Sequence, residues 1–189
     1  RVLSGMAAGI MLAASVWSLL LPAIERTREL GVAAWVPPSA GLVLGAAGLL
    51  RLESMAGQLL QRGKSRMVLA VTLHNLPEGM VVGLAAALAL SGEPDAVSGA
   101  LALSLGIGLQ NIPEGAAVSL QAFGAGAASG LVEPLGALAA FALAGWVQAA
   151  LPWLMSAAAG CMVCVTAQEM IPEAVEQDEP AGVVSIVLG

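Results

Sequence analysis

The sequence predicts an all-α polytopic membrane protein, and its composition and hydropathy support this prediction. Of the 189 residues, 58% are hydrophobic and only 11% are charged, and the mean hydropathy is +0.88. A soluble domain of this size has too large a surface to hide so much apolar area. Several apolar stretches also reach the roughly 20 residues that a helix needs to cross a bilayer. Abundant Ala, Gly, Leu and Val then favour close packing of such helices.

Six complete spans and the start of a seventh can be placed along the chain. Short connections separate them, including FGAGAASG at 123–130 and LP at 151–152, and short connections make neighbouring helices antiparallel. We therefore expect residues 1–189 to form a single transmembrane domain. The apolar segments at both ends lead us to expect further helical sequence beyond them. The predicted spans cover residues 2–24, 35–52, 67–91, 97–122, 126–151 and 153–175, with the seventh starting near Ala181.

The basic residues indicate an orientation, because all seven lie at or before Arg66. The 51–66 connection holds four of them against one acid, Glu53, so the positive-inside rule predicts that it is a cytoplasmic loop. The alternating spans then place three tryptophans near the outer interface, where an aromatic ring with a polar N–H is favoured. These are Trp35, Trp146 and Trp153.

Two similar segments carry costly polar residues within apolar spans. They are LHNLPEGMVVG at 73–83 and LQNIPEGAAVS at 109–119, 36 positions apart. An ionisable side chain at mid-bilayer costs roughly 2.5–3.5 kcal/mol on insertion scales, so it needs a compensating role. Residues four apart share a helix face, which groups each glutamate with the polar residue one turn before it. The residues on or beside these faces are His74, Asn75, Glu78, Gln110, Asn111 and Glu114.

The same two segments predict a binding site at a helix interruption. Pro77 and Pro113 each remove a backbone hydrogen bond, and matching interrupted helices are typical of a transporter's substrate site. Two carboxylates, an imidazole and amide oxygens suit a divalent cation such as zinc, iron or manganese. Both glutamates could bridge, which makes a two-metal cluster an open alternative. A second alternative is a pair of buried hydrogen bonds that only fix packing, but the duplication favours a site.

Three further groups extend this prediction along a path. Glu133, about one turn into the fifth predicted span, could complete the cluster, or could be a solvated acid at a helix end. At the cytoplasmic end, Gln168, Glu169 and Glu173 could form an exit or an interfacial face. Met11, Ser18 and Glu25 are seven residues apart and form one stripe about 21 Å long, with Glu25 at the outer mouth; the alternative is ordinary packing.

These residues resemble the ZIP (Zrt-/Irt-like) family of metal transporters. The motifs are HNLPEG at 74–79, QNIPEG at 110–115, GLVEPLGAL at 130–138 and QEMIPEA at 168–174. The resemblance implies an eight-helix fold, of which the first helix and most of the last lie outside this sequence. It implies an entrance at Ser18 and Glu25 and an exit at Glu169. It also implies one metal site of Met11, His74, Glu78, Gln110 and Glu114, and an adjacent one of Asn75, Glu78, Asn111, Glu114 and Glu133.

The expected function is transport of a divalent cation, most simply Zn²⁺, with Cd²⁺, Fe²⁺ or Mn²⁺ as alternative substrates and no organic cofactor. The resemblance implies movement toward the cytoplasm. We expect a multi-pass protein of the bacterial cytoplasmic membrane whose partners are divalent ions and lipid, not nucleic acid; a homodimer is left open. Rival hypotheses are a proton-linked carrier of an organic substrate and an intramembrane metalloenzyme. The sequence contains no HExxH pair, which counts against the metalloenzyme.

Overall fold

The computed structural model describes residues 2–31, 33–59, 64–92, 95–146, 148–176 and 180–189. This part of the chain is helical, with short turns and no strand, so the predicted all-α class is confirmed. By length and composition, two of its helical segments can cross a membrane, Ser4–Glu29 and Leu151–Val175. Shorter apolar runs occupy Asn75–Leu90, Ala96–Leu109 and Val132–Ala144.

Two of the helical segments change winding along their length. α1 (Val2–Ala14) continues through the π-helix η1 (Ser15–Leu20) into α2 (Leu21–Glu29). α7 (Leu151–Val165) likewise continues through the π-helix η3 (Thr166–Met170) into α8 (Ile171–Val175). The other elements are α3 (Val36–Leu59), α4 (Lys64–Leu90), α5 (Ala96–Gly130), α6 (Val132–Trp146), the 3₁₀ turn η2 (Gln148–Ala150) and α9 (Pro180–Leu188).

Two predicted boundaries are wrong. The segment 123–130 was predicted as a connection, but it belongs to α5, and the helix is interrupted only at Leu131. The predicted connection at 151–152 is the start of α7. Proline explains both shifts, because Pro134 and Pro152 stand in the first turn of α6 and α7, where a missing N–H costs no intrahelical bond. Helices also extend into the 51–66 connection, as far as Leu59 and from Lys64 onward.

Glycines bring helix backbones together in two groups. In the first group, formed by α4, α5 and α6, the backbone of Glu133 lies against Gly79 and that of Ala137 against Gly83. The second group contains the α1–α2 and α7–α8 segments, α3 and α9, and here the backbone of Ala157 lies against Gly45. Such small residues permit the closest helix approach. Between the groups, by contrast, the side chain of Ile10, and not a backbone, packs against Gly106.

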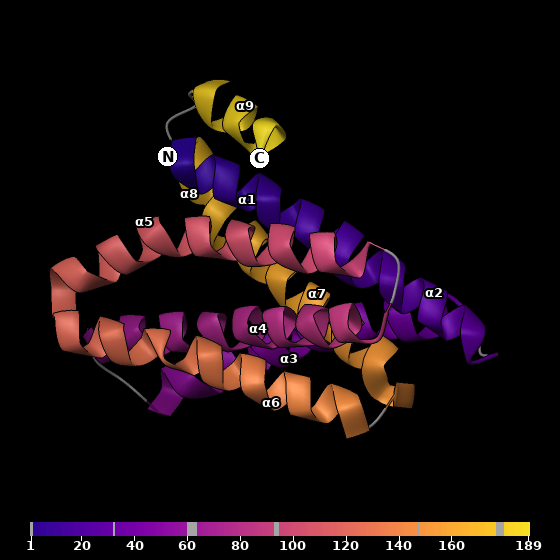
Figure 1. Ribbon diagram of the computed structural model, residues 1–189. Coiled ribbons are helices and arrows are strands. Elements are labelled where there is room, and N and C mark those ends of the chain that lie inside the picture. Colours follow the sequence, from indigo (N-terminus) through magenta and orange to yellow (C-terminus); the bar gives the residue numbers. More distant parts are fainter. Residues whose placement is uncertain (1, 32, 60–63, 93–94, 147, 177–179) are drawn as a thin grey trace.

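Figure 1 shows how these groups meet. α4 and α6 run beside each other, α5 curves back at one end of the bundle toward α6, and α7 passes across α4 to reach the α1 side. α9 lies along α1. The buried core is shared by both groups, with Leu84 and Leu103 from one group and Met11 and Met155 from the other. Polar residues buried at this junction are therefore placed at the centre of the bundle.

Candidate metal-binding site

Glu78 occupies the interior of α4, directly after the proline that interrupts it. Its side chain is 2% exposed, and Asn75, almost one turn earlier, is 6% exposed. Pro77 lies inside the helix, so its position lacks the backbone N–H that would normally bond back to the preceding turn. A buried carboxylate beside such an interruption needs polar or cationic partners, since leaving it in an apolar environment is costly.

A hydrogen bond joins the next two helices, α5 and α6, to each other. The Asn111 side chain of α5 donates from Nδ2 to Oε2 of Glu133 in the first turn of α6, at 2.7 Å. The backbone of Glu133 lies against Gly79, the residue after Glu78. Three helices thus meet at Gly79, Asn111 and Glu133, one residue after Glu78. The Oδ1 atom of Asn111 is buried and accepts no hydrogen bond from the described residues, which leaves an amide oxygen of the kind that binds cations.

For three predicted ligands, the structure describes the backbone but not the side chain. The backbone places His74 on α4 and places Gln110 and Glu114 on α5, but their side chains are outside the described residues. Among the side chains that the structure does describe, no group of three or more His, Cys, Asp or Glu is arranged to hold a metal ion. We use the name inner cluster for the predicted site residues whose side chains the structure describes on α4, α5 and α6: Asn75, Glu78, Asn111 and Glu133.

Met11 is held by hydroxyl groups at the start of both π-helices. Its side chain is 1% exposed. Thr166, the first residue of η3, places its Oγ1 3.6 Å from the Met11 sulfur, and Ser15, the first residue of η1, donates to the Met11 carbonyl at 2.7 Å. Neither hydroxyl was predicted as functional. Thr166 precedes the sequence AQEM of the exit motif, whereas no signal in the sequence marks Ser15.

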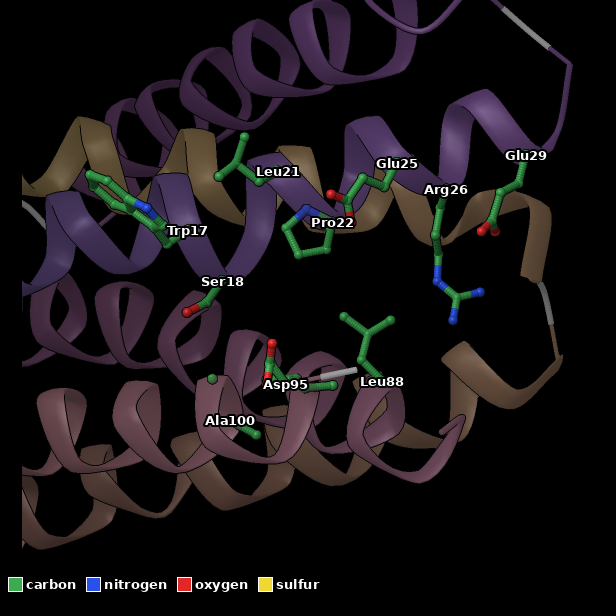
Figure 2. Close-up of a pocket in the computed structure, with 13 residues that line it drawn as sticks. Trp17, Ser18, Leu21, Pro22, Glu25, Arg26, Glu29, Leu88, Asp95 and Ala100 are labelled. Carbon is green, nitrogen blue, oxygen red and sulfur yellow. The ribbon is translucent and has the colours of Figure 1, made fainter. Parts of the chain in front are cut away.

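A cavity of about 260 Å³ lies between the two helix groups, near the C-terminal end of α4. We call it the outer cavity. Ser18 and Glu25 both line it, and Figure 2 shows them on the α1–α2 segment facing α5. Met11 does not line it. The π-helix between them changes the register of the predicted stripe, because i→i+5 bonds place more residues in each turn. The remaining lining residues are Trp17, Leu21, Pro22, Arg26, Glu29, Ala85, Leu88, Asp95, Ala96, Gly99 and Ala100.

Charged residues that were not predicted also line this outer cavity. Asp95 reaches it from the start of α5, and Arg26 reaches it from α2 (Figure 2). The Arg26 guanidinium donates from Nη2 to the Ser91 hydroxyl at 3.0 Å, and Ser91 in turn donates to the Leu88 carbonyl. The outer cavity thus combines Glu25, Glu29 and Asp95 with one cation. No spacing in the sequence connects Asp95 with α2.

The predicted exit residues lie on the surface of the second helix group. Gln168 and Glu169 are exposed on η3, and Glu173 is exposed on α8. Thr166 and Met170 of the same π-helix are buried. The polar residues of η3 are therefore exposed, while Thr166 of the same π-helix is buried and contacts Met11.

Buried glutamate and asparagine side chains where three apolar helices meet define the class: a helical membrane protein with an interior polar site. No family model matches the sequence. The chain is 36% identical over 180 residues to zinc transporter GufA of Myxococcus xanthus, covering 83% of the chain and 69% of that protein. It is 30% identical over 271 residues to human zinc transporter ZIP11 (90% and 79%) and 36% over 188 residues to zinc transporter ZIPB of Bordetella bronchiseptica (89% and 61%).

The chain belongs to the ZIP family of metal transporters. The predicted family is thereby confirmed. Its relatives are transporters and not enzymes, which removes the metalloenzyme hypothesis.

Proposed function

We propose that this protein transports zinc across the cytoplasmic membrane of a bacterium, toward the cytoplasm, through the inner cluster. The observation that carries this proposal is the Asn111–Glu133 hydrogen bond, next to the contact between the Glu133 backbone and Gly79. These contacts join three apolar helices one residue after the buried Glu78. Relatives that cover most of the chain are zinc transporters. Cd²⁺, Fe²⁺ and Mn²⁺ use the same ligand types and are alternative substrates.

The proposed ligands form two adjacent sites that share the central glutamates. One site takes Met11, His74, Glu78, Gln110 and Glu114, and the other takes Asn75, Glu78, Asn111, Glu114 and Glu133. Carboxylates supply the charge that offsets the loss of the cation's hydration shell. Ligands bind metal in their deprotonated form, so metal entry displaces protons. The buried Oδ1 of Asn111 supports a role for this amide in the second site.

The proposed path begins at the outer cavity and ends beside η3. The carboxylates of Glu25, Glu29 and Asp95 attract a hydrated cation to the cavity, where Ser18 lies deeper along the same segment. Release on the other side takes place past Gln168, Glu169 and Glu173. We propose six complete spans and the beginning of a seventh in this chain, within an eight-helix bundle whose 51–66 connection faces the cytoplasm.

The alternation between outward and inward access is proposed to be a sliding of the two helix groups. Within each group, backbones contact each other at glycines such as Gly79 and Gly45, which leaves little freedom for relative movement. Between the groups, the contact at Gly106 is made by the Ile10 side chain and not by a backbone, which leaves this boundary less tightly held than the glycine contacts within each group. The inner cluster lies within the first group and would move with it.

Zinc uptake into liposomes that contain the full-length protein tests this function. Glu78→Ala removes the central carboxylate and should abolish uptake of ⁶⁵Zn²⁺. Glu53→Ala is the matched control, because this acid lies on α3 outside the inner cluster, and it should leave uptake within about twofold. Undiminished uptake by Glu78→Ala contradicts the proposal. Proton flux that a zinc chelator leaves unchanged would instead favour the proton-linked organic carrier.

A further inference from the structure

The thioether of Met11 is the softest donor in the proposed metal path, and it is held in place by one residue of another helix. Thr166 Oγ1 lies 3.6 Å from the Met11 sulfur, and both side chains are almost fully buried. A methionine side chain has three rotatable bonds and adapts easily to its surroundings. A fixed polar contact at the sulfur therefore restricts where this flexible donor can point.

The Thr166 hydroxyl has a second acceptor. Its Oγ1 also lies 2.8 Å from the carbonyl oxygen of Met162, one turn earlier in α7. A hydroxyl carries a single proton, and a thioether is the weaker acceptor. When a cation takes a lone pair of the sulfur, the proton of Thr166 can remain on the Met162 carbonyl. Releasing the sulfur to a metal therefore leaves no buried polar group without a partner.

The two π-helices are both anchored at Met11. Ser15 begins η1 and donates to the Met11 carbonyl, while Thr166 begins η3 and contacts the Met11 sulfur. Wide turns of this kind occur frequently at functional sites. Here each carries a predicted path residue, since Ser18 lies in η1 and Gln168 lies in η3. Met11 is thus one of the points at which the entrance and exit segments are in contact.

We propose that Thr166 is a positioning residue that orients the Met11 thioether and thereby sets the preference for soft over harder divalent cations. This inference rests on the proposed function, in which Met11 is a metal ligand. Thioether ligands favour soft ions, so Cd²⁺ gains more than Zn²⁺ from a well-placed sulfur. Losing the Thr166 hydroxyl leaves the sulfur mobile, and the advantage of Cd²⁺ falls.

Competitive uptake of ¹⁰⁹Cd²⁺ and ⁶⁵Zn²⁺ by liposomes with the full-length protein measures this preference as a ratio of kcat/KM values. Thr166→Val keeps the shape of the side chain and removes the hydroxyl, and it should lower the Cd²⁺/Zn²⁺ ratio about two- to tenfold. Thr166→Ser keeps the hydroxyl and should restore the ratio. Met11→Ala should lower the ratio as well, and the double variant should show no further loss, because both changes remove the same interaction.

Thr27→Val is the matched control. Thr27 is also fully buried, and its hydroxyl also donates to the carbonyl one turn earlier, that of Ala23 at 2.7 Å. No described contact joins it to a methionine sulfur, so the ratio should not change. The inference is overturned if Thr166→Val leaves the ratio unchanged, if Thr27→Val lowers it equally, or if the losses of Met11→Ala and Thr166→Val add. Zinc uptake that survives Glu78→Ala overturns the proposed function instead, so the two failures are distinguishable.

Discussion

The inner cluster and the outer cavity both use carboxylates, but they place them in opposite surroundings. Glu78 is 2% exposed and Glu133 is bonded to Asn111, whereas Glu25 and Asp95 are exposed. Charges interact strongly where water is excluded, while exposed charges are screened over roughly 8 Å at physiological salt. In the proposed mechanism, the same chemical group would therefore bind and dehydrate a cation in the inner cluster but only concentrate hydrated cations in the outer cavity.

The two regions also differ in what fixes their shape. The inner cluster is built on α4, α5 and α6, and backbone contact at Gly79 sets the spacing of α4 and α6. The outer cavity is lined by the α1–α2 segment on one side and by the ends of α4 and α5 on the other. A movement of one helix group past the other would change the outer cavity and leave the inner cluster intact. The predictions below test this contrast.

The largest effect is expected from neutralising an inner carboxylate. Glu133→Gln keeps an oxygen that can accept from Asn111 but removes the charge, and the KM for zinc uptake should rise about 10–100-fold. Glu29→Gln, the same change in the outer cavity, should alter the KM less than about fivefold. Equal effects in initial-rate uptake measurements would break the contrast between the two regions.

A smaller effect is expected from separating α4 and α6. A methyl group at position 79 would overlap the backbone carbonyl of Glu133, which cannot move as a side chain can. Gly79→Ala should therefore destabilise the protein by about 1–3 kcal/mol, seen as a lower midpoint of thermal unfolding in detergent. Gly48→Ala on α3 is the control, because nothing lies within 4 Å of the added methyl group, and its midpoint should not fall. A normal midpoint for Gly79→Ala would contradict the packing described for the inner cluster.

The smallest effect is expected from the cation of the outer cavity. Arg26→Gln leaves Glu25, Glu29 and Asp95 without their positive neighbour, so the KM for zinc should fall about two- to threefold at low ionic strength. High salt should remove the difference, because the three carboxylates are exposed and Arg26 is only partly buried. Arg28→Gln is the control, since Arg28 lies on the same helix but does not line the cavity. A salt-independent change, or an equal change in Arg28→Gln, would mean that the outer cavity does not act by attraction.

The all-helical class could be predicted from the sequence because apolar runs are local signals, whereas the site that the paired polar residues indicate stays a prediction. The positions of Asn75 and Glu78 follow from their place inside α4. The start of α6 was misplaced because the glycines of 123–130 suggested a turn, although a helix can tolerate glycine when its surroundings support it. The proline after Glu133 was the better signal for a helix start.

The contacts of Met11 and Arg26 could not be predicted in the same way. Both depend on how two helices distant in the sequence meet: Thr166 is 155 residues from Met11, and Ser91 is 65 residues from Arg26. The π-helices are equally hidden, since the segments Ser15–Leu20 and Thr166–Met170 have no composition that separates them from α-helix. Unless it is known which helices pack together, the sequence predicts neither the helical register at a π-helix nor the residue that contacts Met11 or Arg26.

The pairing of α1 with α9 has a consequence for how the protein is made. Gly5 packs against Ser185, and the backbone of Ile186 lies against Gly9 (Figure 1). Of the described helices, α1 leaves the ribosome first and α9 leaves it last. The surface of α1 at Gly5 and Gly9 is therefore uncovered until α9 has been inserted. Assembly of the second helix group therefore depends on the order of synthesis, since its first helix is completed only when α9 packs against it.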